Sequence, residues 1–123
     1  MVSVSDFITL KKVDCHNHLN LGMRYASYVP WAGFQKPNYP RKMNGLGEMH
    51  EVIGQYTRVR IATKKDVQDV ITLAVQDAVA DGITVLEGSF DINFVNHCGG
   101  NVDEFCQLAE DIRKKFEGKI DLR

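Results

Sequence analysis

The sequence predicts an α/β fold in which short parallel strands alternate with amphipathic helices, and three observations indicate it. Residues 83–89 begin with a β-branched run typical of a buried strand. Over residues 63–80 and 101–117, apolar residues recur at steps of three and four, as on one face of a helix. The resulting order is strand, long loop, helix, strand, helix, strand, which is typical of βαβ units. The chain stops within the third strand, so we expect a piece of a larger protein.

The first strand is expected over residues 12–19, where polar and apolar residues alternate. Successive side chains of a strand point to opposite faces, which places Asp14, His16 and His18 together. The opposite face is expected to carry three apolar side chains, those of Val13, Cys15 and Leu19.

Residues 20–62 are expected to form a long loop that contains one short helix at about 48–56. Three prolines and several glycines punctuate this stretch. Between them lie five aromatic residues, Tyr25, Tyr28, Trp31, Phe34 and Tyr39. A loop of this length is usually functional, such as a lid or a ligand cage. Packing of the loop against the rest of the protein explains the aromatic residues equally well.

Both long helices begin at capping residues. Thr63 with Asp66 resembles a capping box, although Asp replaces the usual Glu or Gln. Asn101 can cap the second helix, with Glu104 three residues later. A third strand is expected to begin at Lys119.

The composition fits one soluble globular domain. Hydrophobic residues make up 44% of the 123 residues and charged residues 25%, with a formal net charge of -1. No basic stripe supports binding to nucleic acid or to a membrane surface, and no apolar run is long enough to span a membrane. The N-terminus shows no signal peptide, and three cysteines argue against a disulfide framework. We therefore expect a cytoplasmic protein with reduced thiols, with Cys15 and Cys106 in the core.

His16 and His18 form the most informative pair. Residues at i and i+2 of a strand project to the same side, and neutral imidazoles suit zinc and other divalent metals. A catalytic metal site needs three or more protein ligands, so further ligands must come from elsewhere. The pair lies at the end of the first strand of a (βα) series, where barrel enzymes place catalytic residues. Asp14, one step deeper in the strand, is expected to support the site without binding the metal.

Other polar residues allow two interpretations each. Asp91 and His97 follow the second strand and can contact a substrate there, but a loop histidine is also commonly just solvated. Cys98, which precedes two glycines, is either a reactive thiol or a small buried loop residue. His50 is expected on the surface of the short helix.

Two segments resemble a known family. Residues 12–20 read Lys-Val-Asp-Cys-His-Asn-His-Leu-Asn, which resembles the opening strand of the adenosine deaminase-like branch of the amidohydrolase superfamily. In that branch an apolar or acidic run precedes His-x-His-Leu-Asp-Gly. Residues 80–87, Ala-Asp-Gly-Ile-Thr-Val-Leu-Glu, resemble its second strand. The resemblance covers roughly residues 10–22 and 63–90, and it implies the N-terminal part of a (β/α)8 TIM barrel.

The resemblance also implies a chemistry. His16 and His18 would be the first two ligands of a divalent metal, expected to be zinc, which activates water for attack on a carbon bearing an amine or amide leaving group. The other ligands and the acid/base residue lie on later strands of the family, so the chain alone is expected to be inactive. Asn20 departs from the family's Asp, which helps to hold the sugar of a nucleoside, so adenosine does not carry over as the substrate. Asn20, Asp91 and His97 are the candidate substrate-binding residues.

Two other functions stay open. PHP-like metal phosphoesterases also begin with His-x-His, but they continue with Thr, Ser and Asp, a pattern that residues 19–22 lack. A non-catalytic piece that associates with copies of itself would bury exposed sheet edges and apolar faces. The expected partners are a small-molecule substrate and either a second copy of the chain or the missing part of the barrel, with neither nucleic acid nor membrane.

Overall fold

The computed structural model describes residues 3–33 and 40–123. Two of the five predicted aromatic residues of the loop, Phe34 and Tyr39, lie outside these described ranges. The elements in chain order are α1 (Val4–Ile8), β1 (Lys12–His18), α2 (Tyr25–Ala32), α3 (Leu46–Tyr56), the 3-10 helix η1 (Arg58–Arg60), α4 (Lys64–Ala80), β2 (Ile83–Ser89), α5 (Phe94–His97), α6 (Val102–Lys115) and β3 (Asp121–Leu122). Within the described ranges, no helix is long and apolar enough to cross a membrane.

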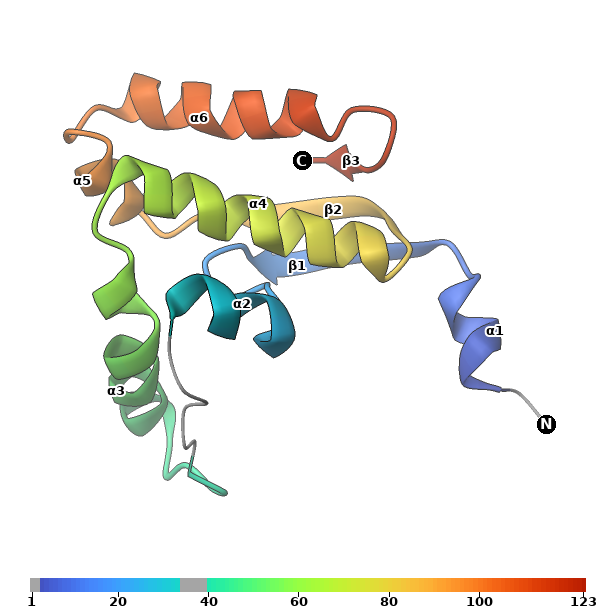
Figure 1. Ribbon diagram of the computed structural model, residues 1–123, viewed down its shortest axis with the longest axis horizontal. Helices are drawn as coiled ribbons and strands as arrows, with labels where there is room; N and C mark the ends of the chain where they lie inside the picture. Colours follow the sequence, from blue (N-terminus) through green and yellow to red (C-terminus); the bar gives the residue numbers. More distant parts are fainter. Residues whose placement is uncertain (1–2, 34–39) are drawn as a thin grey trace.

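The strands form one parallel sheet in the order β1-β2-β3. Figure 1 shows α4 and α6 running alongside each other next to this sheet, with α3 extending away from it. The predicted α/β class with parallel strands is therefore confirmed.

Helices α4 and α6 cover the sheet through regular apolar stripes. In α4 the buried residues are Val67, Val70, Ile71, Ala74, Val75 and Ala78, as the periodicity predicts. In α6 they are Phe105, Leu108 and Ile112, at steps of three and four. Leu86 of β2 is wholly buried beneath this layer, while its neighbour Glu87 is exposed on the other face of the sheet. One face of the sheet is thus packed, and the other is open.

The expectation that Cys15 and Cys106 lie in the core is wrong, because both thiols are exposed. Cys106 lies on a flank of α6 that borders a hollow at the edge of β3, beside Phe90 and Leu122. That edge has no further strand against it among the described residues, so the flank stays uncovered.

A bulge in β1 explains the exposure of Cys15. Asp14 pairs with Leu86 and Asn17 pairs with Gly88, so two residues of β1 oppose one residue of β2. The extra residue reverses the alternation of side chains along the strand. Asp14 consequently shares the packed face with Leu86, and the prediction that it shares a face with His16 and His18 is wrong.

Helix α2 lies within the stretch that the sequence predicts as a loop, and the prediction of irregular chain over its residues is wrong. Pro30 is a helix breaker by propensity, yet it lies inside this eight-residue helix. Tertiary contacts outweigh the propensity, because the backbone N–H of Arg24 and the hydroxyl of Ser27 both donate to Asp77 of α4. The helix ends at Gly33, whose φ of 67° is readily adopted by glycine.

The contact between β1 and β2 predicts that a methyl group added at residue 88 has a large effect on the free energy of unfolding. A Cβ at Gly88 would lie 2.9 Å from Cγ of the wholly buried Leu19, whereas a Cβ at Gly54 of α3 meets nothing within 4 Å. Gly88→Ala is expected to lower the free energy of unfolding by about 1–3 kcal/mol. Gly54→Ala is expected to raise it by up to about 1 kcal/mol, since alanine favours the helix. Urea denaturation measures both, and equal effects of the two variants would contradict this packing.

The capping box of α4 predicts a dependence of stability on pH. Burial raises the pKa of Asp66, but hydrogen bonds from the Thr63 hydroxyl and from the backbone N–H groups of Ala62 and Thr63 outweigh it, and the pKa lies below its ordinary value of 3.8. A lowered pKa in the folded state means that the carboxylate stabilises the protein above about pH 3.8, and that this stabilisation is lost as the pH falls through the lowered value. The stability difference between wild type and Asp66→Asn should be constant near neutral pH and shrink below about pH 4. A difference that grows on acidification would contradict the assignment.

Candidate metal and substrate site at the carboxyl end of the strands

The carboxyl ends of β1 and β2 lie side by side and carry the candidate site. His18 pairs with Ser89, and the backbone N–H of Leu19 donates to the carbonyl of Ser89 at 3.0 Å. The segments that follow the two strands therefore leave the sheet at the same edge. The wholly buried side chain of Leu19 fixes this edge against Gly88.

The two imidazoles predicted as metal ligands face each other at this edge. Nε2 of His16 lies 3.2 Å from Nε2 of His18, and both side chains are exposed to solvent. Two nitrogens bound to one tetrahedral zinc ion at about 2.0–2.1 Å lie about 3.3 Å apart. The observed spacing fits a shared metal ion, and an imidazole pair is a suitable donor set for zinc. Among the described residues, no group of three or more His, Cys, Asp or Glu side chains could hold a metal, so this part of the chain presents an imidazole pair without further ligands.

Asp14 supports the strand beneath the histidines. One carboxylate oxygen accepts from the backbone N–H of His16 at 3.1 Å, and the other accepts from Nδ2 of Asn17 at 2.8 Å. Asn17 in turn lies against Gly22, where a Cβ would be 3.1 Å from Cγ of the amide. Both oxygens of Asp14 thus hold the bulge, as the expected supporting role requires.

The three candidate substrate-binding residues lie together. Asn20, Asp91 and His97 all line one cavity of about 120 Å³. We call it the polar cavity after these three side chains, although most of its lining surface is apolar. Its remaining lining residues are Leu21, Ile53, Thr57, Arg58, Ile61, Asn93 and Phe94. His16 and His18 do not line it; they precede it on β1, and Asn20 follows His18 by two residues.

Sequence reasoning missed the contribution of α3 and η1 to this cavity. Ile53 lies in the short helix predicted at about 48–56, whereas Thr57 and Arg58 follow it in chain predicted as loop. Arg58 is exposed and supplies a positive charge at the cavity wall. No local pattern indicates this wall, because it depends on how the end of α3 and η1 lie against the segments that follow β1 and β2.

Two polar side chains of the cavity, Asp91 and Asn20, differ in their hydrogen bonding. Asp91 accepts from both the backbone N–H and Nδ2 of Asn93, which fixes the turn before α5 and His97. Oδ1 of Asn20 is buried and finds no hydrogen-bond partner among the described residues. A buried acceptor without a partner costs about 1–3 kcal/mol, so this oxygen is suited to receive an N–H or O–H of a ligand.

His50 lies on the protein surface, and Cys98 is buried. His50 is exposed on α3, as expected. Cys98 is only 2% exposed, which matches its interpretation as a small buried loop residue.

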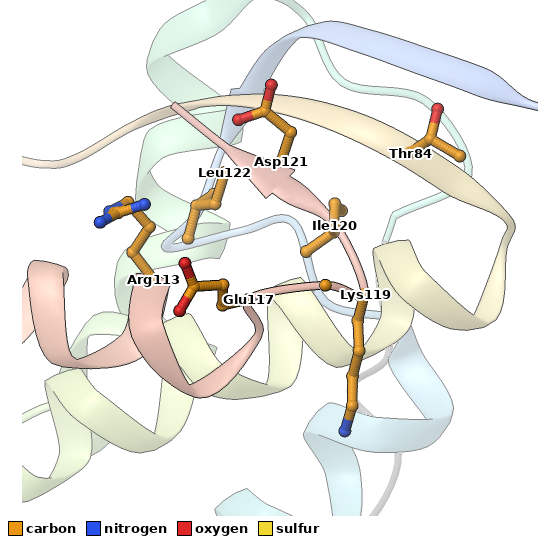
Figure 2. Close-up of a pocket in the computed structure, with 8 residues that line it drawn as sticks. Thr84, Arg113, Glu117, Lys119, Ile120, Asp121 and Leu122 are labelled. Carbon is orange, nitrogen blue, oxygen red and sulfur yellow. The ribbon is translucent and has the colours of Figure 1, made fainter.

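A larger hollow lies at the opposite end of the sheet. Figure 2 shows it at the turn from α6 to β3, with Thr84, Arg113, Glu117 and Lys119 among its labelled residues. Its volume is about 470 Å³, and it borders the unpaired edge of β3 at the amino ends of the strands. No His or Cys lines it, so we do not assign the chemistry to it.

Comparison with known proteins decides the family resemblance. The chain is 42% identical over 122 residues to a protein of Treponema pallidum (strain Nichols) that is named "Putative adenosine/adenine deaminase". The match covers 99% of this chain and 41% of that relative, so the chain spans about two fifths of the length of the curated relative it matches. No family model and no solved structure matches it. The resemblance to the deaminase branch, stated from residues 12–20 and 80–87, is thereby confirmed.

The buried Oδ1 of Asn20, which lacks a hydrogen-bond partner among the described residues, leads to a prediction about stability. Asn20→Leu removes a buried acceptor without a partner, so the free energy of unfolding should stay equal or rise by about 1 kcal/mol. Asn17→Leu is the matched control, because it likewise removes a buried acceptor without a partner but also breaks the Nδ2 hydrogen bond to Asp14. Its free energy of unfolding should therefore lie about 1 kcal/mol below that of Asn20→Leu. Chemical denaturation measures both. A larger loss in Asn20→Leu than in Asn17→Leu would contradict the assignment.

Proposed function

We propose that this chain supplies the first metal-binding strand and part of the substrate pocket of a metal-dependent deaminase or amidohydrolase. The observation that carries the proposal is the pair of imidazole nitrogens of His16 and His18, 3.2 Å apart at the carboxyl end of β1. The similarity to a putative adenosine/adenine deaminase supports hydrolysis at an amine-bearing carbon over the phosphoesterase alternative.

Each residue of the proposed site would have a separate role. His16 and His18 would hold a divalent metal, which we propose to be zinc, and Asp14 would keep the bulge in place. The metal, when bound, supplies activation of a water molecule for hydrolysis. Asn20, Asp91 and His97 would bind and orient a small-molecule substrate in the polar cavity. No residue of the chain is assigned as the catalytic acid or base.

The open face of the sheet supports a place at the start of a (β/α)8 barrel. Val13 is 60% exposed, and Glu87 is exposed on the same face. In a closed barrel this face would point inward and be covered by side chains of the other strands. We propose that a further part of the protein, or a second copy of the chain, covers it. Sedimentation of the purified chain distinguishes a monomer from a self-associated form.

The metal proposal predicts how zinc binds to the chain. His16→Ala and His18→Ala should each weaken zinc binding at least tenfold, because each removes one of two donors. His50→Ala removes an exposed imidazole remote from the strand and should leave binding unchanged. Isothermal titration of the 123-residue chain with a zinc salt measures all three. Equal affinity in wild type and His16→Ala would overturn the site.

The proposed roles of these residues predict that the purified chain is inactive by itself. With two proposed metal ligands and no assigned acid or base, it should not release ammonia from adenine or adenosine above the rate of the zinc-containing buffer. An ammonia-coupled assay measures this, with the His16→Ala variant as the control for contaminating activity. Turnover that His16→Ala abolishes would show that the chain is sufficient and would contradict the proposed roles.

A further inference from the structure

Glu87 of β2 carries a carboxylate on the open face of the sheet, next to the proposed metal ligands. The bulge in β1 places Cys15 and His16 together opposite Glu87. After the bulge the side chains alternate normally, and since Leu19 is wholly buried on the packed face, His16 and His18 project from the open face. Neighbouring strands lie about 4.7–4.9 Å apart, so the Glu87 carboxylate and the His16 imidazole are lateral neighbours on one face.

Arg123 continues this row of side chains beyond β2. Its backbone N–H and carbonyl both form hydrogen bonds of 2.9 Å, to the residues on either side of Glu87. Because Leu122 is buried on the packed face, Arg123 and Asp121 project from the open face. The Arg123 guanidinium donates twice to one oxygen of Asp121, at 2.9 and 2.6 Å. This hydrogen bonding raises the pKa of Arg123, and the charges of Asp121 and Glu87 raise it further.

The position of Glu87 suits a partner of a metal ligand better than a ligand itself. Within residues 3–33 and 40–123, Glu87 and the two histidines do not form a group that could hold a metal ion. Nε2 of His16 faces Nε2 of His18, so Nδ1 is the ring nitrogen left for a second contact. A metal-bound imidazole almost always donates its other ring N–H to a carboxylate, a backbone carbonyl or water, which fixes its tautomer and orientation. Glu87 and His16 are both exposed, so each side chain can turn to make this contact.

We propose that Glu87 is a positioning residue for His16, and that its carboxylate accepts the Nδ1–H of this imidazole when Nε2 binds the metal. The hydrogen bond would orient the ring and raise the basicity of the ligand. Arg123 would hold the carboxylate from the opposite side. The inference rests on the proposed function, because it takes His16 and His18 as metal ligands.

Zinc titration of the 123-residue chain tests the effect on metal binding. Glu87→Ala should weaken zinc binding about 10–100-fold, as is typical for the loss of such a partner. Glu87→Gln keeps an oxygen that can accept the Nδ1–H, so it should weaken zinc binding less than Glu87→Ala does. Glu51→Gln is the matched control, because it removes an exposed carboxylate on α3 and should leave zinc binding unchanged. Equal zinc affinity in wild type and Glu87→Ala would overturn the inference.

The Nδ1 proton of His16 distinguishes a hydrogen bond from a loss of negative charge near the metal. In nitrogen-15 spectra of the zinc-loaded chain, this proton should exchange slowly with water in wild type and in Glu51→Gln, and rapidly in Glu87→Ala. Exchange at the same rate in wild type and Glu87→Ala would overturn the positioning role.

The zinc titration also separates this inference from the proposed function. If His16→Ala loses zinc binding but Glu87→Ala retains it in full, Glu87 has no positioning role and the metal ligands stand. If His16→Ala binds zinc as tightly as wild type, the metal site fails and the role of Glu87 fails with it.

Discussion

The close packing of Leu19 against Gly88 is the contact on which the rest of the site depends. Leu19 is wholly buried, and its side chain occupies the space that a Cβ at residue 88 would need. Burial of a leucine contributes about 1.5–3 kcal/mol, and here it locks the ends of two neighbouring strands together. His18 precedes Leu19 and Asn20 follows it, so this one buried side chain helps to position both the proposed metal ligands and the polar cavity.

The bulge in β1 adapts the strand to this arrangement. It turns Asp14 toward the packed face, where both carboxylate oxygens accept hydrogen bonds from the strand itself. The imidazoles of His16 and His18 are left exposed and face each other. Bulges commonly re-aim side chains next to active sites, and here the cost is a local loss of ladder pairing at Cys15 and His16.

Local sequence patterns predicted the elements that depend on local forces. The stripe of α4 and the Thr63–Asp66 cap follow from helical periodicity and from hydrogen bonding within one turn. The bulge was not predictable, because it depends on register with β2, and alternation alone placed Val13, Asp14 and Cys15 on the wrong faces. Helix α2 was missed because Pro30 argues against a helix, whereas contacts to Asp77, fifty residues away in the chain, decide the outcome. The grouping of Asn20, Asp91 and His97 followed from the parallel order of the strands, but the wall formed by Arg58 did not.

The central claim is that His16 and His18 bind one metal ion together. X-ray absorption at the zinc edge of the zinc-loaded chain measures it most directly, because the outer-shell scattering counts imidazole ligands. We expect two imidazoles per zinc ion, with nitrogen or oxygen atoms completing the first shell at about 2.0–2.1 Å. A spectrum with one imidazole or none in that shell would contradict it.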